Sequence, residues 1–252
     1  MYSILIIVPT KNSLNTIEKL VSSLNKQTEQ NWRVIFIDYK SRKIFKDYLR
    51  DICQSNKKFS IIEQKSNTGI YGAMNIGFDL IQKNEWILFW GSDDYAFNNT
   101  TIENIIKEIK THNSQDLIIF QGIFVNHYTG ISNSGNHFSS LDTQNINANK
   151  YKNILFKGFR QSHQGTLINP RNNLKSLKYN TKFMLAADLN FYLECTEIKN
   201  LKVRIVKKII VNIGEGGISR RKNIIRFKEV IYIYFIYFRF LFFVPFILRY
   251  IK

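Results

Sequence analysis

Short apolar runs alternate with segments of helical spacing along the first half of the chain. The runs have the length of buried strands, and the segments between them repeat apolar residues every three or four positions, as helices do. Strands are predicted over Ser3–Val8, Trp32–Ile37, Phe59–Glu63, Trp86–Trp90 and Leu117–Gln121, and helices over Asn15–Asn25, Ile44–Ile52, Gly72–Gln82 and Asn104–Lys110. This alternation predicts an α/β fold with a doubly wound, mostly parallel sheet flanked by helices.

The second half is less regular. Residues 126–150 are poor in apolar side chains and rich in Asn, Ser and Gly, which predicts a long loop or insert. Beyond it, a strand is predicted over Gly165–Asn169, a helix over Ala186–Cys195, and a strand pair or one bent strand over Val203–Ile213. A glycine-rich break follows at Gly214–Gly217.

The last segment, Val230–Ile251, is apolar and crowded with Tyr and Phe. Its length is close to the roughly 20 residues that span a bilayer, but Arg239 lies in its middle and Pro245 is expected to break any helix there. Tyr and Phe suit the membrane interface, and a basic cluster lies just upstream, at Arg220, Arg221, Lys222, Arg226 and Lys228. An in-plane membrane anchor is the favoured interpretation, over a core-packing helix and a membrane span.

Net charge is unevenly distributed along the 252 residues. Residues 1–149 carry a balance of +1, whereas residues 150–252 hold 21 Lys and Arg against 5 Asp and Glu, a balance of +16. A patch of this sign favours an anionic partner such as a membrane surface, a nucleic acid or a phosphorylated substrate. The two cysteines, Cys53 and Cys195, suggest no disulfide scaffold, and the opening strand does not read as a signal peptide, so a cytoplasmic location is expected.

Acidic and polar residues follow several of the predicted strands. Asp93 and Asp94 end the apolar run Trp86–Trp90, Asp38 ends the second strand, and the segment Pro9–Asn12 follows the first. The carboxyl ends of parallel strands share one edge of a sheet, where α/β proteins bind ligands. These residues therefore predict a nucleotide site, in which a carboxylate pair can hold a divalent cation beside a diphosphate.

The segment between the third strand and Asp93 contains Gly69, Gly72 and Gly77. Their spacing matches neither the dinucleotide-binding fingerprint nor a phosphate-binding loop with its Lys-Ser/Thr pair. The glycines alone are thus a weak signal, and both of those folds are disfavoured.

Taken together, these motifs resemble glycosyltransferase family 2, the nucleotide-sugar-dependent transferases of the A-type fold. Within it, the bacterial polysaccharide and colanic-acid-type enzymes are the most similar. The matching segments are Val8–Asn12, Ile35–Asp38, Asn67–Gly77, Trp86–Asp94, His163-Gln164 and Ala186–Asp188. The resemblance covers about residues 3–195, and Gly69–Asp94 is its most specific part.

The resemblance implies roles for individual residues. Pro9, Thr10 and Asn12 match the lining of the nucleotide pocket, and Asp38 matches the carboxylate that holds the base. The positions that match polar or glycine residues near the donor are Asn67, Gly69 and Asn75, while Asp93 and Asp94 match the metal motif, with Asp94 as the direct ligand of Mn²⁺ or Mg²⁺.

On the acceptor side, Asp188 matches the catalytic base of inverting members. His163 and Gln164 match a pair that contacts the acceptor or the diphosphate, and Gly214–Ser219 with Arg220 and Arg221 resembles a mobile loop over the donor. Taken singly, Asp188 is also compatible with a helix cap, His163 with a structural role and Asp38 with a turn.

We therefore expect a catalytic domain over residues 1–218, with a nucleotide-binding half over 1–122, an acceptor-side half over 123–218, and a basic, aromatic membrane-associating tail over 219–252. The expected function is inverting, metal-dependent transfer of a sugar from a nucleotide-diphosphate donor to a glycan or a polyprenyl-diphosphate-linked acceptor. The enzyme would work in surface polysaccharide synthesis, peripheral on the anionic inner face of the membrane, with no nucleic-acid partner. The alternatives are a nucleic-acid-binding module, suggested by charge alone, and a nucleotidyltransferase.

Overall fold

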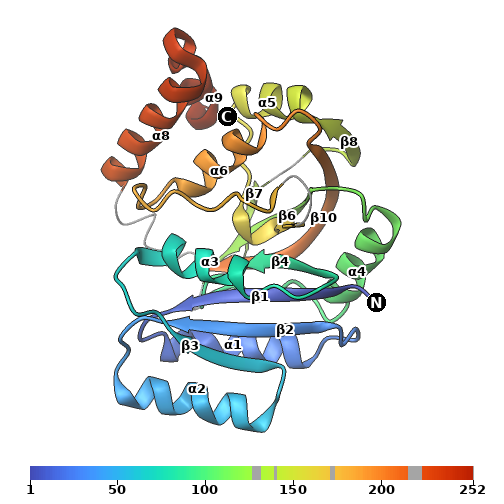
Figure 1. Ribbon diagram of the computed structural model, residues 1–252, viewed down its shortest axis with the longest axis vertical. Coiled ribbons are helices and arrows are strands. Elements are labelled where there is room, and N and C mark those ends of the chain that lie inside the picture. The colour runs from blue at the N-terminus through green and yellow to red at the C-terminus, as the bar shows by residue number, and fades with distance from the viewer. Residues whose placement is uncertain (127–131, 139–140, 171–173, 215–222, 252) are drawn as a thin grey trace.

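The computed structural model describes residues 1–126, 132–138, 141–170, 174–214 and 223–251. Its centre is one sheet, in which the strands follow the order β3-β2-β1-β4-β9-β6-β10-β5, while β7 pairs with β6 and β8 with β10. Figure 1 shows this sheet running through the molecule, with helices on both of its faces.

The N-terminal half of the sheet is parallel throughout. Its strands are β1 (Ser3–Thr10), β2 (Trp32–Asp38), β3 (Phe59–Glu63) and β4 (Glu85–Phe89), connected by the helices α1 (Leu14–Asn25), α2 (Lys43–Ser55) and α3 (Gly69–Asp79). Thr10 pairs with Asp38 in the register of β1 and β2, so the ends of these two strands meet. The parallel arrangement therefore brings the predicted polar strand ends to one edge.

The other half of the sheet is mixed. Its strands are β5 (Tyr95–Ala96), β6 (Leu117–Val125), β7 (Ser132–Phe138), β8 (Gln144–Asn147), β9 (Thr166–Ile168) and β10 (Lys202–Gly214). The helices between them are α4 (Thr101–Thr111), α5 (Ala148–Phe156) and α6 (Ala187–Cys195), and the short 3-10 turn η1 (His163–Gly165) precedes β9. β6 and β10 run parallel, while β9 is antiparallel to both β4 and β6. β9 thus joins the two halves, and the fold class predicted from the sequence is confirmed.

The core lies on both faces of the sheet because side chains alternate along each buried strand. On one face, Ile4, Ile6 and Val8 of β1 pack with the apolar sides of α1, α2 and α4. On the other, Leu5 and Ile7 pack with α3, α5, α6 and α8 (Asn223–Phe238). This two-sided burial explains why the sequence of β1 is apolar without a break.

Residues 126–150 were predicted to be a long loop, and for the described part of that range the prediction is wrong. It contains β7, β8 and the start of α5. In β8 only Ile146 is buried, and the strand pairs with β10 on one side, so its sequence Gln-Asn-Ile-Asn lacks the apolar run of a central strand. The region Val203–Ile213 is a single strand, and its register against β6 shifts at two places, in agreement with the bent-strand interpretation.

The C-terminal segment forms two helices. α8 is followed by a 3-10 turn, η3 (Arg239–Leu241), and by α9 (Phe243–Ile251). The expectation that Pro245 breaks the helix is wrong, because Pro245 lies in the first turn of α9, where a missing N–H leaves no intrahelical bond unmade. The chain instead changes direction at Arg239, which has a φ of 49°.

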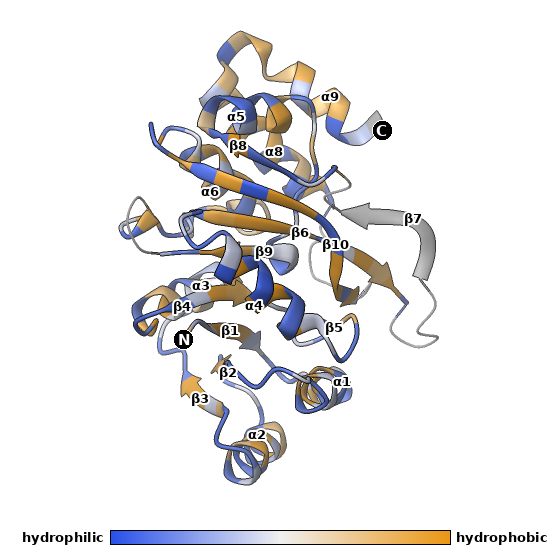
Figure 2. Ribbon diagram, turned by 90° about the vertical axis from the view of Figure 1, so that its right-hand side faces the viewer, coloured by the Kyte–Doolittle hydropathy of each residue, from blue (hydrophilic) through white to orange (hydrophobic). Residues whose placement is uncertain are grey.

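The outer faces of these two helices are apolar. Eleven of the sixteen exposed large apolar side chains of the described residues lie between 224 and 250, and Phe240 is 88% exposed. Figure 2 shows this end of the molecule largely in the colour of hydrophobic residues. In the described parts of the chain, none of the helices combines the length and the apolar character needed to cross a membrane.

Candidate active site

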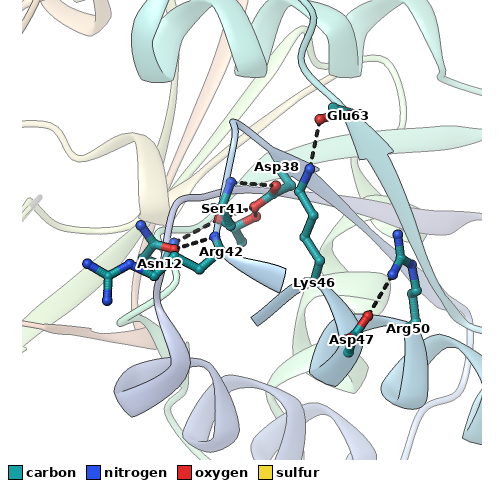
Figure 3. A network of polar contacts seen from close by, with 9 residues as sticks. Asn12, Asp38, Ser41, Arg42, Lys46, Asp47, Arg50 and Glu63 are labelled. Carbon is teal, nitrogen blue, oxygen red and sulfur yellow. Dashed lines mark hydrogen bonds and ion pairs between the residues drawn. The ribbon is translucent and has the colours of Figure 1, made fainter. Parts of the chain in front are cut away.

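Asp38 is the centre of a polar cluster at the end of β2. Its carboxylate is buried and accepts a hydrogen bond from Thr10 Oγ1 at 3.2 Å. It also accepts hydrogen bonds from the Ser41 N–H at 3.2 Å and from Ser41 Oγ (Figure 3). A buried carboxylate is unfavourable unless it is hydrogen-bonded, and these donors supply that compensation. The predicted nucleotide-pocket residues Thr10 and Asp38 are therefore in contact.

The loops after β1 and β2 support each other through Asn12. The Asn12 N–H donates to Ser41 Oγ at 2.8 Å, and Asn12 Oδ1 accepts from the Arg42 N–H at 2.8 Å (Figure 3). Asn12 has a φ of 53°, a left-handed conformation that Asn tolerates better than most residues. Pro9 is half-buried at the end of β1. Thr10 and Asn12 thus belong to the cluster, and the role of Pro9, Thr10 and Asn12 in lining a nucleotide pocket stays a prediction.

Asp93 and Asp94 lie just beyond β4. Asp94 is buried and accepts hydrogen bonds from the Gly91 N–H and, at 3.2 Å, from the N–H of Gly214 at the end of β10. Burial raises the pKa of Asp94 well above its usual range, and the charge of Asp93 raises it further, while hydrogen bonds from Gly91, Gly214 and Gln164 lower it. The carboxylate pair is therefore in a place where a positive charge would be strongly stabilised.

Two glycines pack directly against this pair. A methyl group on Gly91 would lie 2.7 Å from Asp93 Oδ1 and 3.1 Å from Asp94 Oδ2, and one on Gly214 would lie 2.7 Å from Asp93 Oδ2. Any side chain at either glycine would thus collide with the carboxylates or displace them. In the described ranges, no three His, Cys, Asp or Glu side chains cluster to hold a metal. Hard divalent cations often bind through one or two carboxylates together with substrate phosphates, so the pair fits a cation shared with a diphosphate.

Asp188 lies in the first turn of α6, next to His163 of the turn η1. Its Oδ1 accepts a hydrogen bond from the Tyr71 hydroxyl at 3.3 Å and from the Leu189 N–H at 2.8 Å, and its Oδ2 lies 3.5 Å from His163 Nδ1. The Asp188 side chain is 21% exposed, so it is held by neighbours yet remains reachable from outside.

Opposing influences act on the pKa of Asp188. Burial raises it, but the hydrogen bond and charge of His163, the charge of Arg249 and the Leu189 N–H together bring it below its ordinary value. The carboxylate is thus ionised at neutral pH, which is the state that a general base requires.

The turn η1 connects the two carboxylate sites. His163 faces Asp188, and the next residue, Gln164, hydrogen-bonds the Asp94 carboxylate. The Trp90 indole N–H donates to the Gln164 carbonyl at 3.0 Å, which fixes the turn against the end of β4. The residues predicted to serve the metal, the acceptor and the base therefore meet in one place.

The three remaining predicted donor residues lie on or before α3. Asn67 is exposed, and Gly69 begins the helix with a φ of 67°. The Asn75 amide makes two 2.8 Å hydrogen bonds with the backbone N–H and carbonyl of Tyr179. Asn75 therefore ties α3 to the segment before α6, and a donor role for these three residues stays a prediction.

Several residues of the site were missed at the sequence level. Ser41 and Tyr71 donate to Asp38 and Asp188, and the sequence gave only weak signals for them: Ser41 lies three residues after Asp38, and Tyr71 lies inside the segment Asn67–Gly77. Glu229 and Arg249, which act near α6 from the C-terminal helices, had no local signal. Most of the predicted loop Gly214–Ser219, with Arg220 and Arg221, lies outside the described residues.

Residues 5–164 match the family described as Glycosyl transferase family 2. A glycosyltransferase of PGL/p-HBAD biosynthesis from Mycobacterium bovis is 26% identical over 215 residues, covering 85% of this chain and 78% of that protein. A poly(ribitol-phosphate) beta-glucosyltransferase from Bacillus spizizenii is 34% identical over 92 residues, 36% of this chain and 14% of its own.

Solved structures agree with the fold. S. aureus TarS 1-349 superposes with a TM-score of 0.68 at 17% identity, covering 92% of this chain. This chain spans 64% of that structure, which is just under two thirds. The mannosyltransferase PcManGT from Pyrobaculum calidifontis, in complex with GDP-Man and Mn²⁺, gives 0.62 at 14% identity, over 98% of this chain and 70% of its own.

The match covers well over half of the chain, and the arrangement of strands, helices and carboxylates is consistent with it. The chain belongs to glycosyl transferase family 2 and has the A-type glycosyltransferase fold. The resemblance stated from the sequence motifs is thereby confirmed.

Proposed function

We propose that this glycosyltransferase moves a sugar, with inversion, from a nucleotide-diphosphate donor to a hydroxyl of a glycan or lipid-linked acceptor in surface polysaccharide synthesis. The observation that carries the proposal is the convergence of Asp94 and Asp188 on the single turn η1, beside the Asp38 cluster at the neighbouring strand ends. A transfer site needs a place for the diphosphate next to a base, and this arrangement offers both.

The donor half of the proposal rests on the Asp38 cluster. One buried carboxylate at the end of β2, fixed by Thr10 and Ser41, is suited to accept hydrogen bonds from a base or ribose. Solved structures with this fold bind UDP, UDP-GlcNAc and GDP-Man, which makes those nucleotides the first donors to test.

The acceptor half rests on Asp188. In the proposed step, Asp188 takes the proton of an acceptor hydroxyl while that oxygen bonds to the anomeric carbon of the sugar. The bond between that carbon and the diphosphate breaks, and a nucleoside diphosphate leaves with the electron pair. Attack from the face opposite the leaving group inverts the configuration. His163 and Tyr71 keep the carboxylate oriented toward the hydroxyl.

A divalent cation, Mn²⁺ or Mg²⁺, would be held by Asp93 and Asp94 and would neutralise charge that develops on the diphosphate. The adjacency of the two carboxylates supports this assignment, because hard divalent cations bind carboxylate oxygens. So does the elevated pKa of Asp94, because a nearby cation would favour the ionised carboxylate.

The location proposed is the inner face of the membrane, with the tail from residue 219 on lying against anionic lipid. Exposed apolar side chains on α8 and α9, among them Tyr232, Phe240 and Phe243, support this, together with the positive charge of the C-terminal part of the chain. A groove of about 450 Å³ lies beside α8, lined by Lys182, Lys228, Phe183, Tyr232 and Ile236, among other residues. Glu229 also lines the groove, but its carboxylate accepts three backbone hydrogen bonds, so the two lysines and the apolar side chains suit an acceptor that joins a phosphate to a lipid chain.

A thermal-shift screen tests the donor assignment. UDP, UDP-GlcNAc and GDP-mannose are added with and without Mn²⁺ to the wild type, to Asp94→Ala and to Asp142→Ala, whose exposed carboxylate pairs with Lys207 and contacts none of the site residues named above. At about 100 times its dissociation constant, a true donor stabilises by about 2.7 kcal/mol. The proposal predicts a Mn²⁺-dependent shift that Asp94→Ala loses and Asp142→Ala keeps. Equal shifts in all three proteins would contradict it.

A further inference from the structure

The C-terminal helix α8 is joined to the catalytic body through Glu229. The Glu229 carboxylate accepts three backbone hydrogen bonds, from the N–H groups of Met184 at 2.7 Å, Leu185 at 2.8 Å and Ala186 at 3.0 Å. These residues lead directly into α6, which carries Asp188 in its first turn. One side chain of the tail thus fixes the backbone that sets where α6 begins.

Helix α9 is attached at a second point, where it meets Gly158. A methyl group on Gly158 would lie 2.5 Å from the carbonyl carbon of Leu248 and 2.6 Å from the backbone nitrogen of Arg249, and Gly158 has a φ of 79°. Contacts this short to backbone atoms leave no space for any side chain at Gly158. The backbone of α9 therefore packs closely against the end of α5, as the proximity of these two helices in Figure 1 illustrates.

The same contact orients the side chain of Arg249. Its Nη1 donates to the carbonyl of Phe159 at 3.3 Å, four residues before His163. Tyr234, fully buried on α8, faces the same guanidinium, and the charge of Arg249 lowers the pKa of Tyr234, which burial raises. Burial lowers the pKa of Arg249, but the charges of Tyr234, Tyr250 and Asp188 raise it above its ordinary value.

We propose that α8 and α9 are part of the catalytic centre, in which Glu229 and Arg249 are positioning residues for Asp188. Glu229 fixes the chain at the start of α6, and the half-buried Arg249, held on the Phe159 carbonyl, adds a positive charge that acts on the Asp188 carboxylate. The inference rests on the proposed function, since it assigns a task to the base named there. It gives the C-terminal segment a role in the reaction in addition to membrane contact.

The electrostatic surroundings of Asp188 explain why such a charge is useful. Burial disfavours the ionised carboxylate, and Tyr71, Tyr179 and Tyr192 surround it with neutral rings. His163 from η1 and Arg249 from α9 supply the opposing charge. The charge on His163 depends on its protonation, whereas an arginine stays charged at every pH at which proteins are folded. Arg249 is thus the permanent cation of the group.

The test compares four full-length variants with the wild type: Glu229→Gln, Arg249→Met, Arg249→Lys, and Arg50→Met as a control that removes an exposed arginine of α2. Release of nucleoside diphosphate gives kcat, donor KM and the pH profile of kcat/KM, and carbon-13 carboxyl NMR gives the pKa of Asp188. Melting temperatures show whether each variant is folded.

We expect Glu229→Gln and Arg249→Met to lower kcat about tenfold, with donor KM changed less than about twofold, because they alter the base and not the donor site. Arg249→Met should move the acid limb of the profile, and the measured Asp188 pKa, to higher pH. Arg249→Lys keeps the charge and should restore most of the shift, and Arg50→Met should behave as the wild type. If Glu229 and Arg249 had a purely structural role, their variants would have a lower melting temperature and an unchanged Asp188 pKa.

Two outcomes would overturn the inference: wild-type kcat and pH profile in both Glu229→Gln and Arg249→Met, or an Asp188 pKa that is the same in Arg249→Met and the wild type. The variant Asp188→Asn distinguishes a failure of this inference about Glu229 and Arg249 from a failure of the proposed function. If Asp188→Asn is inactive while Glu229→Gln and Arg249→Met behave as the wild type, only the inference about α8 and α9 fails. If Asp188→Asn retains full activity, the base assignment itself is wrong, and the inference falls with it.

Discussion

Asp38 and Asp188 illustrate two ways of placing a carboxylate in a mostly apolar fold. Asp38 is almost fully buried, and side-chain and backbone donors from two loops satisfy it. Asp188 keeps 21% of its side chain exposed and has partners on three different elements. The first arrangement suits the fixed recognition of a ligand, and the second suits a group that exchanges a proton with one.

Replacing Ser41 with alanine should weaken nucleotide binding. Ser41→Ala removes the hydroxyl that donates to Asp38 and accepts from the Asn12 N–H, so the carboxylate and the loop after β1 both lose a restraint. Loss of about 1 kcal/mol corresponds to a roughly fivefold higher dissociation constant for UDP or GDP, measurable by calorimetry. Ser55→Ala, at the far end of α2, is the matched control and should bind as the wild type does. Unchanged affinity in Ser41→Ala would contradict the role given to this cluster.

Replacing Tyr71 with phenylalanine should shift the pH dependence of the reaction. Burial and the Asp188 charge raise the pKa of Tyr71, so its hydroxyl stays protonated and donates to Asp188. A donor to the ionised carboxylate lowers the pKa of that carboxylate, and removing it raises that pKa. Because the ionised form is the active base, Tyr71→Phe should lose activity at the acid end of the profile first, with little change above neutral pH. A profile shifted toward lower pH would contradict this.

At the scale of elements, most of the parallel half could be predicted from sequence, because strands buried on both faces have uninterrupted apolar runs and their helices have clear periodicity. The elements that were missed lack such local signals. β8 is polar at three of its four positions, and the bend between α8 and α9 occurs at Arg239 and not at Pro245. The candidate site residues at strand ends could be named from the sequence, whereas Glu229 and Arg249 come near α6 only through tertiary packing.

Asn75 offers a test at this scale, because its amide connects α3 to the segment before α6. Asn75→Asp keeps the size of the side chain but replaces the group that donates to the Tyr179 carbonyl with an oxygen. We expect the free energy of unfolding to fall by about 1–3 kcal/mol, measured by urea denaturation. Asn56→Asp, at the exposed end of α2, is the control. Wild-type stability in Asn75→Asp would show that the connection is unimportant.

At the scale of the whole molecule, the two ends of the sheet carry different parts of the candidate site. The parallel half carries the Asp38 cluster, proposed to bind the nucleotide, and the other end, with α5, α6, α8 and α9, carries Asp188 and most of the exposed large apolar side chains of the described residues (Figure 1). An acceptor held at a membrane would thus approach from the side on which the proposed base lies. The proposed membrane contact and the proposed acceptor approach would thus involve the same pair of helices.

Membrane contact by this end predicts binding to anionic vesicles. The protein should cosediment with phosphatidylcholine vesicles that contain phosphatidylserine, less so with phosphatidylcholine alone, and less at high salt, because counterions screen the basic residues. The double variant Phe240→Ser and Phe243→Ser removes two of the exposed apolar groups and should reduce binding while leaving the melting temperature unchanged. The same change at Ile44 and Phe97, exposed on the other half, is the control. Binding that depends equally on both pairs would argue against a specific membrane face.

The central claim is that Asp38, Asp94 and Asp188 form one site for sugar transfer, and release of nucleoside diphosphate from a nucleotide sugar tests it most directly. The assay uses wild type and Asp188→Asn, with Mn²⁺ and an acceptor fraction, and the donor-induced thermal shift is recorded alongside. The account predicts that the wild type releases nucleoside diphosphate, and that Asp188→Asn keeps the thermal shift but loses about 10²–10⁴-fold in rate. An Asp188→Asn variant that turns over as fast as the wild type would contradict it.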